Sequence, residues 1–574
     1  MNIVLSTLNA KFIHTNLALR CLKAYAEPDF SIQLKEFTIK DPEMNIVAEL
    51  YSQKPDVLGF SCYIWNIEET INVINLFKKI SPQTKIILGG PEVSYDVPYW
   101  LDRLENIDYI VVGEGEQTFK QLLRALNGEI RVEEVNGIAY QKNSKAVIHP
   151  QTNKLDLKTL PSPFRFEEDR EDLSKRIVYI ETSRGCPFRC QFCLSSIEVG
   201  VRYFDRESIK DEIRYLMANG ARIIKFVDRT FNISRSYAMD MFEFLIQEHV
   251  PGSVFQFEIT GDIMRPEVIQ YLNDHAPAGL FRFEIGVQST NDETNELVMR
   301  KQNWEKLKRT VTMVKDGNKI DQHLDLIAGL PEEDYDSFRN TFNDVFEMRP
   351  EELQLGFLKM LRGTGLRINA DRHQYIYMDH APYEILSNNV LTFDEIIRIK
   401  QVEDVLEKYW NDHRMDLTVN YTTENCFESP YEFFQAFGTY WDDQGWSRIG
   451  HQLEDLFKRL YQFLQVQNIS ELNVVESLMK KDYLLNQKFK PRKPWWEHED
   501  NSEKKKEILQ KLLHDPALAG EEFAALNLKQ KDLYKHTFIE QGVMKNKDGT
   551  YTETFIMAYY DPKDGKSSLF EFTA

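Results

Sequence analysis

The strongest constraint on the fold is an alternation of short apolar runs with amphipathic stretches, which occurs twice along the 574-residue chain. The β-rich runs of the first series are residues 2–6, 32–38, 56–61, 85–88 and 109–112. Near-continuous apolar strands joined by helical crossovers are typical of a parallel sheet covered on both faces. The sequence therefore predicts an α/β fold that begins with a doubly wound parallel sheet, residues 1–140.

A polar, proline-containing stretch, residues 141–176, predicts a linker to the second series. The β-rich runs of that series are residues 177–181, 222–227, 254–259, 281–287, 323–327 and 353–358. Six repeats predict an open, partial (βα)6 barrel over residues 177–381. Residues 382–574 have helical, aromatic-rich patterns and end in two strand-like runs, 553–560 and 567–572, so we expect a mostly helical third domain.

Composition limits the functional classes. The chain is 42% hydrophobic and 28% charged with a formal net charge of −20, which disfavours nucleic acid as a partner because phosphate contacts require a basic face. No apolar run reaches the roughly 18 residues of a membrane span, and the N-terminus does not resemble a signal peptide. We therefore expect a cytoplasmic protein without membrane contact.

Three of the six cysteines, Cys186, Cys190 and Cys193, lie within eight residues, directly after a predicted strand. Thiolates are the usual ligands of iron–sulfur clusters, and three ligands for four irons leave one iron open to a small molecule. The alternative is zinc, but structural zinc needs four ligands. No fourth cysteine is near, and the next histidine downstream, His249, belongs to another βα unit. The spacing favours a cluster.

This spacing, with Phe192 directly before the last cysteine, resembles the signature of the radical S-adenosylmethionine (SAM) superfamily. The resemblance implies a [4Fe–4S] cluster on the three cysteines, whose open iron binds the amino and carboxylate groups of SAM. One electron, from a donor such as flavodoxin or ferredoxin, then cleaves SAM to methionine and a 5′-deoxyadenosyl radical. That radical abstracts hydrogen from the substrate.

Further motifs extend the resemblance through the predicted barrel. They are residues 226–231, 257–259, 284–289 (EIGVQS) and 325–331 (DLIAGLP). The resemblance implies SAM contacts at Phe192, Asp228, Glu258, Glu284, Gln288 and Arg300. The guanidinium of Arg300 is suited to the SAM carboxylate because its fork binds bidentately. For any single buried glutamate, a structural ion pair is an equal alternative.

Two glycine-containing loops follow predicted strands of the first domain, Gly89–Glu92 (GGPE) and Gly113–Glu116 (GEGE). Ahead of a radical SAM core they resemble the cobalamin-binding domain of cobalamin-dependent radical SAM enzymes. The resemblance implies cobalamin contacts at Ser61, Gly89, Gly90, Glu92, Gly113 and Glu114. The chain lacks the Asp-x-His-x-x-Gly motif that supplies a cobalt ligand in the fullest form of this fold, and only His14 is near. Trp65 fits either a corrin face or the core.

The resulting prediction is a radical SAM enzyme that uses a [4Fe–4S] cluster and cobalamin to modify an unidentified small molecule, with methylation as a candidate reaction. A tetrapyrrole-binding carrier with a non-catalytic cluster is one alternative. A tRNA methylthiotransferase is a weaker one, because the first domain has only Cys21 and Cys62. Residues 382–574 resemble a domain of unknown function, whose aromatic residues fit core packing better than a substrate cap.

Overall fold

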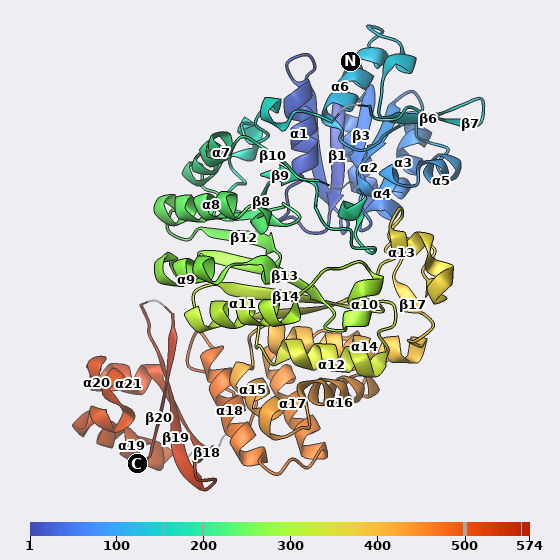
Figure 1. The fold of residues 1–574 in the computed structure, drawn as a ribbon. Helices are drawn as coiled ribbons and strands as arrows, with labels where there is room; N and C mark the ends of the chain where they lie inside the picture. The colour runs from blue at the N-terminus through green and yellow to red at the C-terminus, as the bar shows by residue number, and fades with distance from the viewer. Residues whose placement is uncertain (153, 198–199, 498–501, 564, 574) are drawn as a thin grey trace. The chain divides into compact units, whose positions relative to one another are not determined.

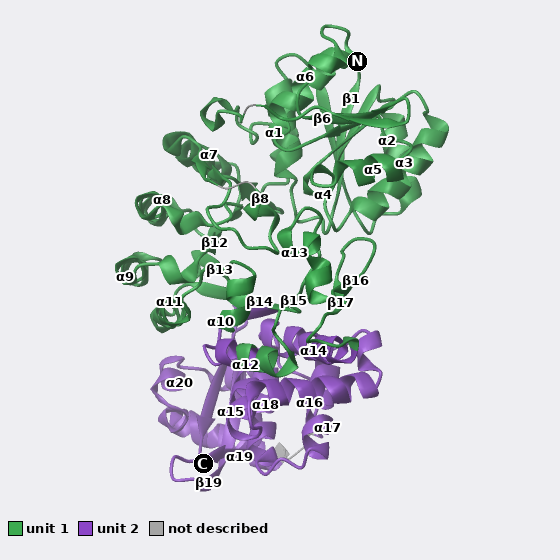
Figure 2. Ribbon diagram, turned by 45° about the vertical axis from the view of Figure 1, so that its right-hand side comes forward, with its two compact units in different colours: residues 1–341, 355–393 green, residues 342–354, 394–574 purple. Residues whose placement is uncertain are grey.

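The computed structural model describes residues 1–152, 154–197, 200–497, 502–563 and 565–573, and Figure 1 shows its fold. The chain forms two compact units, residues 1–341 with 355–393 and residues 342–354 with 394–574 (Figure 2). Among the described helices, none has both the length and the apolar character needed to cross a membrane.

The N-terminal part of the first unit is a seven-stranded sheet in the order β2-β1-β3-β4-β5-β6-β7. Its strands are β1 Ile3–Asn9, β2 Ile32–Thr38, β3 Val57–Ser61, β4 Lys85–Gly89, β5 Tyr109–Val111, β6 Ile138–Lys142 and β7 Lys145–Ile148. Strands β1 to β5 pair in parallel, which confirms the predicted parallel sheet. Its helices are α1 Leu17–Ala26, α2 Glu43–Ser52, α3 Ile67–Ile80, α4 Pro91–Ser94, α5 Val97–Arg103 and α6 Glu116–Leu126.

The antiparallel hairpin β6–β7 was not predicted, and the boundary expected at residue 140 falls inside it. Its turn residues Asn143 and Ser144 both have positive φ, 52° and 58°. Two successive positive φ values define the tight hairpin turn that Asn-Gly usually signals. The sequence Asn-Ser lacks that glycine, so the hairpin escaped the sequence pattern.

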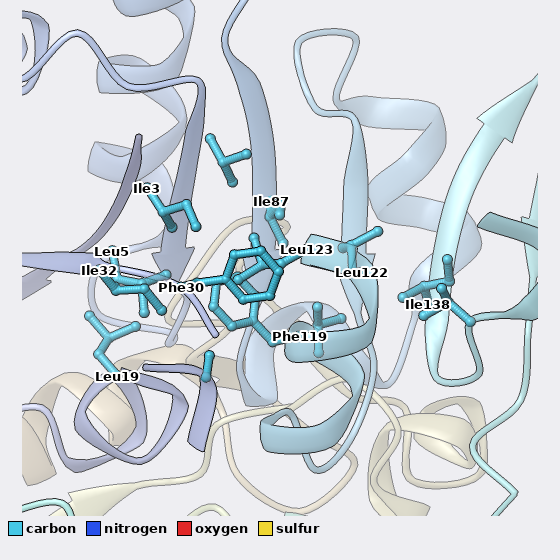
Figure 3. Close-up of a cluster of buried hydrophobic side chains, with 14 of the residues drawn as sticks. Ile3, Leu5, Leu19, Phe30, Ile32, Ile87, Phe119, Leu122, Leu123 and Ile138 are labelled. Atoms are coloured by element: carbon cyan, nitrogen blue, oxygen red, sulfur yellow. The ribbon is translucent and has the colours of Figure 1, made fainter. Parts of the chain in front are cut away.

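The core of this part lies between the sheet and the helices α1 and α6 (Figure 3). Leu19 of α1 and Phe119 of α6 pack against Ile3 and Leu5 of β1, all of them at most 2% exposed. Helices α2 and α3 lie on the other side of the sheet (Figure 1). Both faces are therefore covered, as the doubly wound prediction requires.

The central part is a six-stranded sheet in the order β15-β14-β13-β12-β11-β8. Its strands are β8 Ile177–Ile180, β11 Ile223–Phe226, β12 Val254–Ile259, β13 Phe281–Gln288, β14 Asp321–Ala328 and β15 Glu352–Phe357. Its helices are α7 Arg206–Ala218, α8 Arg235–Glu248, α9 Pro266–His275, α10 Asp292–Leu297, α11 Trp304–Gly317, α12 Tyr335–Phe346 and α13 Gly365–Ile368. The sheet has β8 and β15 as its two edges, so the open six-stranded prediction is confirmed.

Residues alternate between two unlike faces of the central sheet. On β12, Phe255, Phe257 and Ile259 are buried, while Gln256 and Glu258 between them are half-buried. Neighbouring strands share this alternation and are paired in parallel register, so their polar residues lie on one common face. The apolar face packs against the helices, and the polar face carries the side chains that could bind a cofactor or substrate.

Partly buried ion pairs join the two sheets of the first unit. Arg184, in the short strand β9 (Ser183–Arg184), donates from Nη2 to Glu116 Oε1 at 2.5 Å and from Nε to Glu181 Oε2 at 2.9 Å. Arg202 in strand β10 (Arg202–Tyr203) donates to Glu114. Carboxylates at the edge of the first sheet therefore hold the segment that leads into the cysteine loop.

A second set of contacts between distant segments, which we call the Glu92 joint, centres on Glu92, which is 3% exposed. The Tyr383 hydroxyl donates to Glu92 Oε1 at 2.6 Å, and Arg362 Nε lies 4.0 Å from the same oxygen. Arg362 also donates to Asp96 at 2.7 Å. The loop after β4 is thus tied to the chain that follows β15.

The second unit is mostly helical, as predicted. Its helices are α14 Phe393–Leu406, α15 Asp416–Asn425, α16 Pro430–Asp443, α17 Leu453–Val466, α18 Leu472–Leu485, α19 Ser502–His514, α20 Glu521–Ala525 and α21 Gln530–His536. The antiparallel strands β18 Thr537–Lys545, β19 Tyr551–Tyr560 and β20 Ser567–Phe572 form one sheet. Strand β18 was not predicted; the other two were. Trp410, Trp441, Trp495 and Trp496 are all buried, which confirms core packing for them.

The Glu92 joint generates a pH dependence. Burial raises the pKa of Glu92 to about 7, against about 4.3 for glutamate in an unfolded chain. Between these values the folded protein binds a proton that the unfolded chain has lost. This group therefore stabilises the fold below about pH 4.5 and loses that contribution as the pH rises to about 7, with a limiting slope of about 1.4 kcal/mol per pH unit.

We expect the free energy of unfolding to fall less steeply between pH 5 and 7 in Glu92→Gln than in the wild type, measured by urea titration. The exposed Glu267→Gln provides the control and should reproduce the wild-type slope. Parallel slopes for the wild type and Glu92→Gln would contradict this assignment.

Candidate functional site

The three predicted cluster cysteines lie on the loop that follows β8 and β9. None forms a disulfide, Cys186 and Cys190 are 8% and 9% exposed, and Cys193 is half-buried. Burial raises the pKa of the Cys186 and Cys190 thiols, whereas hydrogen bonds from Thr230 and Arg300, respectively, favour their thiolates. Three unpaired thiols on one short loop are a donor set that fits an iron–sulfur cluster.

Main-chain contacts hold this loop from several sides. Gly185 has a φ of +96°, and a Cβ there would lie 2.0 Å from the Gly200 carbonyl oxygen. The Gln191 amide donates to the Val298 carbonyl at 2.9 Å, and the Leu366 amide donates to the Gln191 carbonyl at 3.0 Å. Gln191 stands between Cys190 and Cys193, so the cysteine positions are fixed by the ends of α10 and α13.

Arg300 and Gln288 meet beside the cysteine loop. Arg300 Nη2 donates to the Gly286 carbonyl at 2.5 Å, and its guanidinium also interacts with Cys190. A Cβ on Gly286 would lie 2.5 Å from Gln288 Nε2, so this glycine makes room for the amide. Gln288 has a φ of +70°, and its buried Oε1 has no hydrogen-bond partner among the described residues.

This arrangement fits the amino acid portion of SAM. The Arg300 guanidinium can bind the carboxylate of SAM, and Gln288 Oε1 can accept a hydrogen bond from its ammonium group. Buried acceptors without partners are rare in folded proteins, so a free amide oxygen at this position points to a ligand.

Two predicted SAM contacts face each other on the polar side of the sheet. Glu258 and Glu284 are register partners on β12 and β13. Both oxygens of Glu284 accept from Lys225 Nζ at 2.7 Å, so this carboxylate already has a protein partner. Burial raises the pKa of Glu258, while the charges of Arg229 and Lys225 act in the opposite direction. Glu258 is therefore the freer of the two.

The side chain of Asp228 has a structural role. It is 1% exposed and accepts from the Thr182 amide at 3.0 Å, the Thr182 hydroxyl at 2.7 Å and the Ser183 hydroxyl at 2.5 Å. It holds the end of β8, where the cysteine loop begins, so a SAM contact here can involve only its main chain. Phe192 is half-buried on the loop itself.

The predicted cobalamin residues lie at one edge of the first sheet, where β3, β4 and β5 end. The Ser61 hydroxyl accepts from Asn16 Nδ2 at 3.2 Å. Gly89 and Gly90 follow β4, and Gly90 has a φ of +111°. Gly113 follows β5 with a φ of +76°. Carboxyl ends of parallel strands are the usual binding edge of such sheets.

Not every predicted cobalamin residue points to a ligand. Glu92 and Glu114 bind Tyr383 and Arg202, so their carboxylates hold the two sheets together. Trp65, by contrast, is 46% exposed and stacks on Tyr63 with ring centroids 4.3 Å apart. The core alternative for Trp65 is therefore wrong, and an exposed indole at this edge fits a large flat ligand such as a corrin.

His14 reaches the central sheet. Its Nδ1 lies 2.7 Å from the Tyr179 hydroxyl on β8, and burial lowers the pKa of its imidazole. Tyr179, Lys225 and Arg184 were not selected from the sequence. Lys225 could have been predicted to lie on a polar face of the sheet, because it is a lysine within the otherwise apolar strand Ile-Ile-Lys-Phe.

A cavity of about 470 Å³ borders the cysteine loop at Gln191. Residues of α10 and α13 also line it, including Glu296 and Leu366. No three His, Cys, Asp or Glu side chains of the described residues are gathered closely enough for a single metal ion. A single metal ion needs all its ligands around one point, whereas an iron–sulfur cluster binds each thiolate at a separate iron.

Three family models match the chain: the B12 binding domain over residues 3–123, the Radical SAM superfamily over residues 180–345 and the protein of unknown function DUF4080 over residues 371–554. The radical SAM match implies a [4Fe–4S] cluster and SAM as cofactors of the central part. The B12-binding match supports cobalamin for the N-terminal part.

Among curated proteins, the chain is 26% identical over 389 residues to the cobalamin-dependent radical SAM methyltransferase TokK of Streptomyces tokunonensis, covering 62% of this chain and 54% of TokK. It is 26% identical over 359 residues to 2-(S-pantetheinyl)-carbapenam-3-carboxylate methyltransferase of Streptantibioticus cattleyicolor, covering 57% and 50%. The chain thus spans about half the length of the curated relatives it matches.

Among solved structures, the chain resembles the cobalamin-dependent S-adenosylmethionine radical enzyme OxsB with a TM-score of 0.56 and 16% identity, over 93% of this chain and 83% of OxsB. This likeness shows the fold. The three matched domains identify the chain as a radical SAM protein with an N-terminal B12-binding domain and a C-terminal DUF4080 domain.

Proposed function

We propose that the chain is an enzyme that uses a [4Fe–4S] cluster, SAM and cobalamin to methylate a small molecule. The observation that carries this proposal is the convergence of Arg300 and Gln288 beside the cysteine loop, where Gln288 Oε1 has no hydrogen-bond partner among the described residues. When bound, the cluster supplies the electron that cleaves SAM to a 5′-deoxyadenosyl radical, and cobalamin supplies a carrier for a methyl group.

The protein's own residues bind and orient SAM. Arg300 holds the SAM carboxylate while remaining anchored to the Gly286 carbonyl. Gln288 Oε1 accepts from the SAM ammonium group, which satisfies its buried oxygen. Glu258 lies on the polar face of the sheet, next to its register partner Glu284, and contributes a further carboxylate there. Fixing these groups in advance reduces the ordering that binding requires.

Methylation and cobalamin binding are supported by the N-terminal domain and by the relatives. The exposed Trp65 and the loops at Ser61, Gly90 and Gly113 form one edge. Both curated relatives described above are methyltransferases, and TokK is cobalamin-dependent.

The cluster also needs an electron donor, for which we propose a flavodoxin or ferredoxin. The cavity beside Gln191 brings solvent close to the residue between two of the cysteines, which supports electron entry on that side. We propose the cytoplasm as the compartment, since unpaired cysteines such as these persist in reducing surroundings.

The first prediction concerns the cluster. Reconstituted wild-type protein should form 5′-deoxyadenosine from SAM and dithionite, and Cys190→Ala should form none because one iron loses its thiolate. Iron content and visible absorbance report the cluster directly. Cys426→Ala, which removes a half-buried cysteine in the second unit, should keep both cluster and product. Wild-type protein that binds the cluster but leaves SAM intact would favour the non-catalytic carrier.

The second prediction concerns SAM. Arg300→Lys keeps the charge but loses the bidentate fork, so we expect the KM for SAM to rise at least about tenfold in the 5′-deoxyadenosine assay. The exposed neighbour Lys301→Gln should leave the KM unchanged. An unchanged KM in Arg300→Lys would exclude the proposed contact.

The third prediction concerns cobalamin. The wild type should retain hydroxocobalamin through gel filtration, seen as corrin absorbance. In Trp65→Ala we expect the Kd to rise about five- to tenfold, because stacking of an exposed indole contributes about 1 kcal/mol. The control Tyr51→Ala removes another exposed aromatic residue, 48% exposed on α2, and should bind normally. Equal affinities for all three proteins would remove Trp65 from the site.

A further inference from the structure

A cluster of aromatic and charged side chains lies inside the second unit, within the match to the family of unknown function. We call it the Trp441 cluster. It consists of Asp404, Lys408, Trp441, Trp446, His451 and Arg459. These residues come from α14, the segment after it, α16, the turn after α16 and α17.

Trp441 is the centre of this cluster and is 1% exposed. Lys408 Nζ lies 5.9 Å and Arg459 Cζ 5.5 Å from the centroid of its ring. The rings of Trp446 and His451 lie 5.4 Å and 4.7 Å away, centroid to centroid. Two cations and an imidazole therefore surround one buried indole.

Three buried polar atoms of the cluster have no hydrogen-bond partner among the described residues. They are Trp441 Nε1, His451 Nε2 and Asp404 Oδ2. Native proteins leave few buried polar groups unpaired, since each costs about 1–3 kcal/mol. Three such atoms around one indole point to a missing partner rather than to isolated packing defects.

The hydrogen-bond pattern identifies two of these atoms as donors. Arg459 Nη1 donates to His451 Nδ1. A neutral imidazole that accepts at Nδ1 carries its hydrogen on Nε2. Burial, together with the charges of Arg459 and Lys408, lowers the pKa of His451, which favours its neutral form. Trp441 Nε1 can only donate.

The charges favour an anion. Lys408 is paired with Asp404 at i, i+4. Arg459 has no ion pair with a carboxylate within the described residues. Its side chain is half-buried, and its Cζ lies 5.1 Å from the centroid of the Trp446 ring. A guanidinium with no carboxylate of the described residues within ion-pair distance, beside two unpaired N–H groups, matches the several acceptor oxygens of a carboxylate or phosphate.

The backbone nearby is irregular in a way that is frequent at functional sites. Helix α14 continues as one π-helical turn over Glu407–Asn411, which contains Lys408. Single π turns of this kind recur at binding sites because they redirect side chains. The Tyr409 hydroxyl donates to the Leu456 carbonyl at 2.9 Å, which fixes this turn against α17.

We propose that the Trp441 cluster binds the oxyanion of a small molecule, a carboxylate or a phosphate, through N–H groups of Arg459, Trp441 and His451. Asp404 Oδ2 accepts a hydrogen from a hydroxyl group of the same ligand. Trp446, His451 and Arg459 are half-buried, so the ligand enters from their side. This site is separate from the cysteine loop and assigns a binding role to the second unit.

The test is calorimetric titration of the full-length protein with inorganic phosphate and with acetate, at constant ionic strength set by NaCl. We expect saturable one-site binding of at least one of the two anions. Arg459→Gln should weaken it at least about tenfold, because a charge-assisted hydrogen bond is lost. The matched control Lys458→Gln removes the exposed charge one residue earlier on α17 and should bind as the wild type does.

A second measurement does not depend on how Arg459→Gln folds. The protein contains eight tryptophans, so indole ¹⁵N labelling gives few signals, and Trp441→Phe identifies the one from Trp441. Saturation with the bound anion should move that signal in the otherwise unaltered protein. The proposal is overturned if neither anion binds saturably, if folded Arg459→Gln binds with wild-type affinity, or if the Trp441 indole signal stays fixed.

Discussion

The arrangement of the first unit depends on the ion pairs of the largely buried Arg184 guanidinium. Its side chain is 14% exposed and contacts Glu116, 5% exposed, and Glu181, 22% exposed. Removing one partner of such a group leaves an uncompensated buried charge, which costs about 3–5 kcal/mol. Because Arg184 stands two residues before Cys186, the same ion pairs that join the two sheets also position the cluster ligands.

The central sheet separates stability from chemistry by strand alternation. Its buried face, with residues such as Phe257 and Ile285, packs against helices and stabilises the fold. Its other face gathers Lys225, Glu258 and Glu284, charges that would be costly inside an apolar core. Parallel register aligns these side chains across neighbouring strands, so the same strand alternation produces both the apolar core and the polar face.

Much of the fold was predictable, since eleven β-rich runs of the two series correspond to strands β1–β5, β8 and β11–β15. Alternation and apolar runs are local properties and can be recognised without tertiary contacts. The hairpin β6–β7 was not predicted because its turn lacks a glycine, and strand β18 was not predicted because it lacks a clear alternation of apolar and polar residues. The cysteine loop was predictable because its chemistry lies in eight consecutive residues.

The sequence by itself determined the α/β architecture, the three candidate cluster thiols and the order of the motifs around them. Only the tertiary structure decided which of the predicted polar side chains are available to bind a ligand. Glu114 pairs with Arg202, 88 residues away, and Glu284 pairs with Lys225, 59 residues away, whereas Gln288 Oε1 has no partner within the described part of the chain. The physical reason is that a charged group acts on whatever lies within a few ångströms, and distance along the chain does not specify that neighbour.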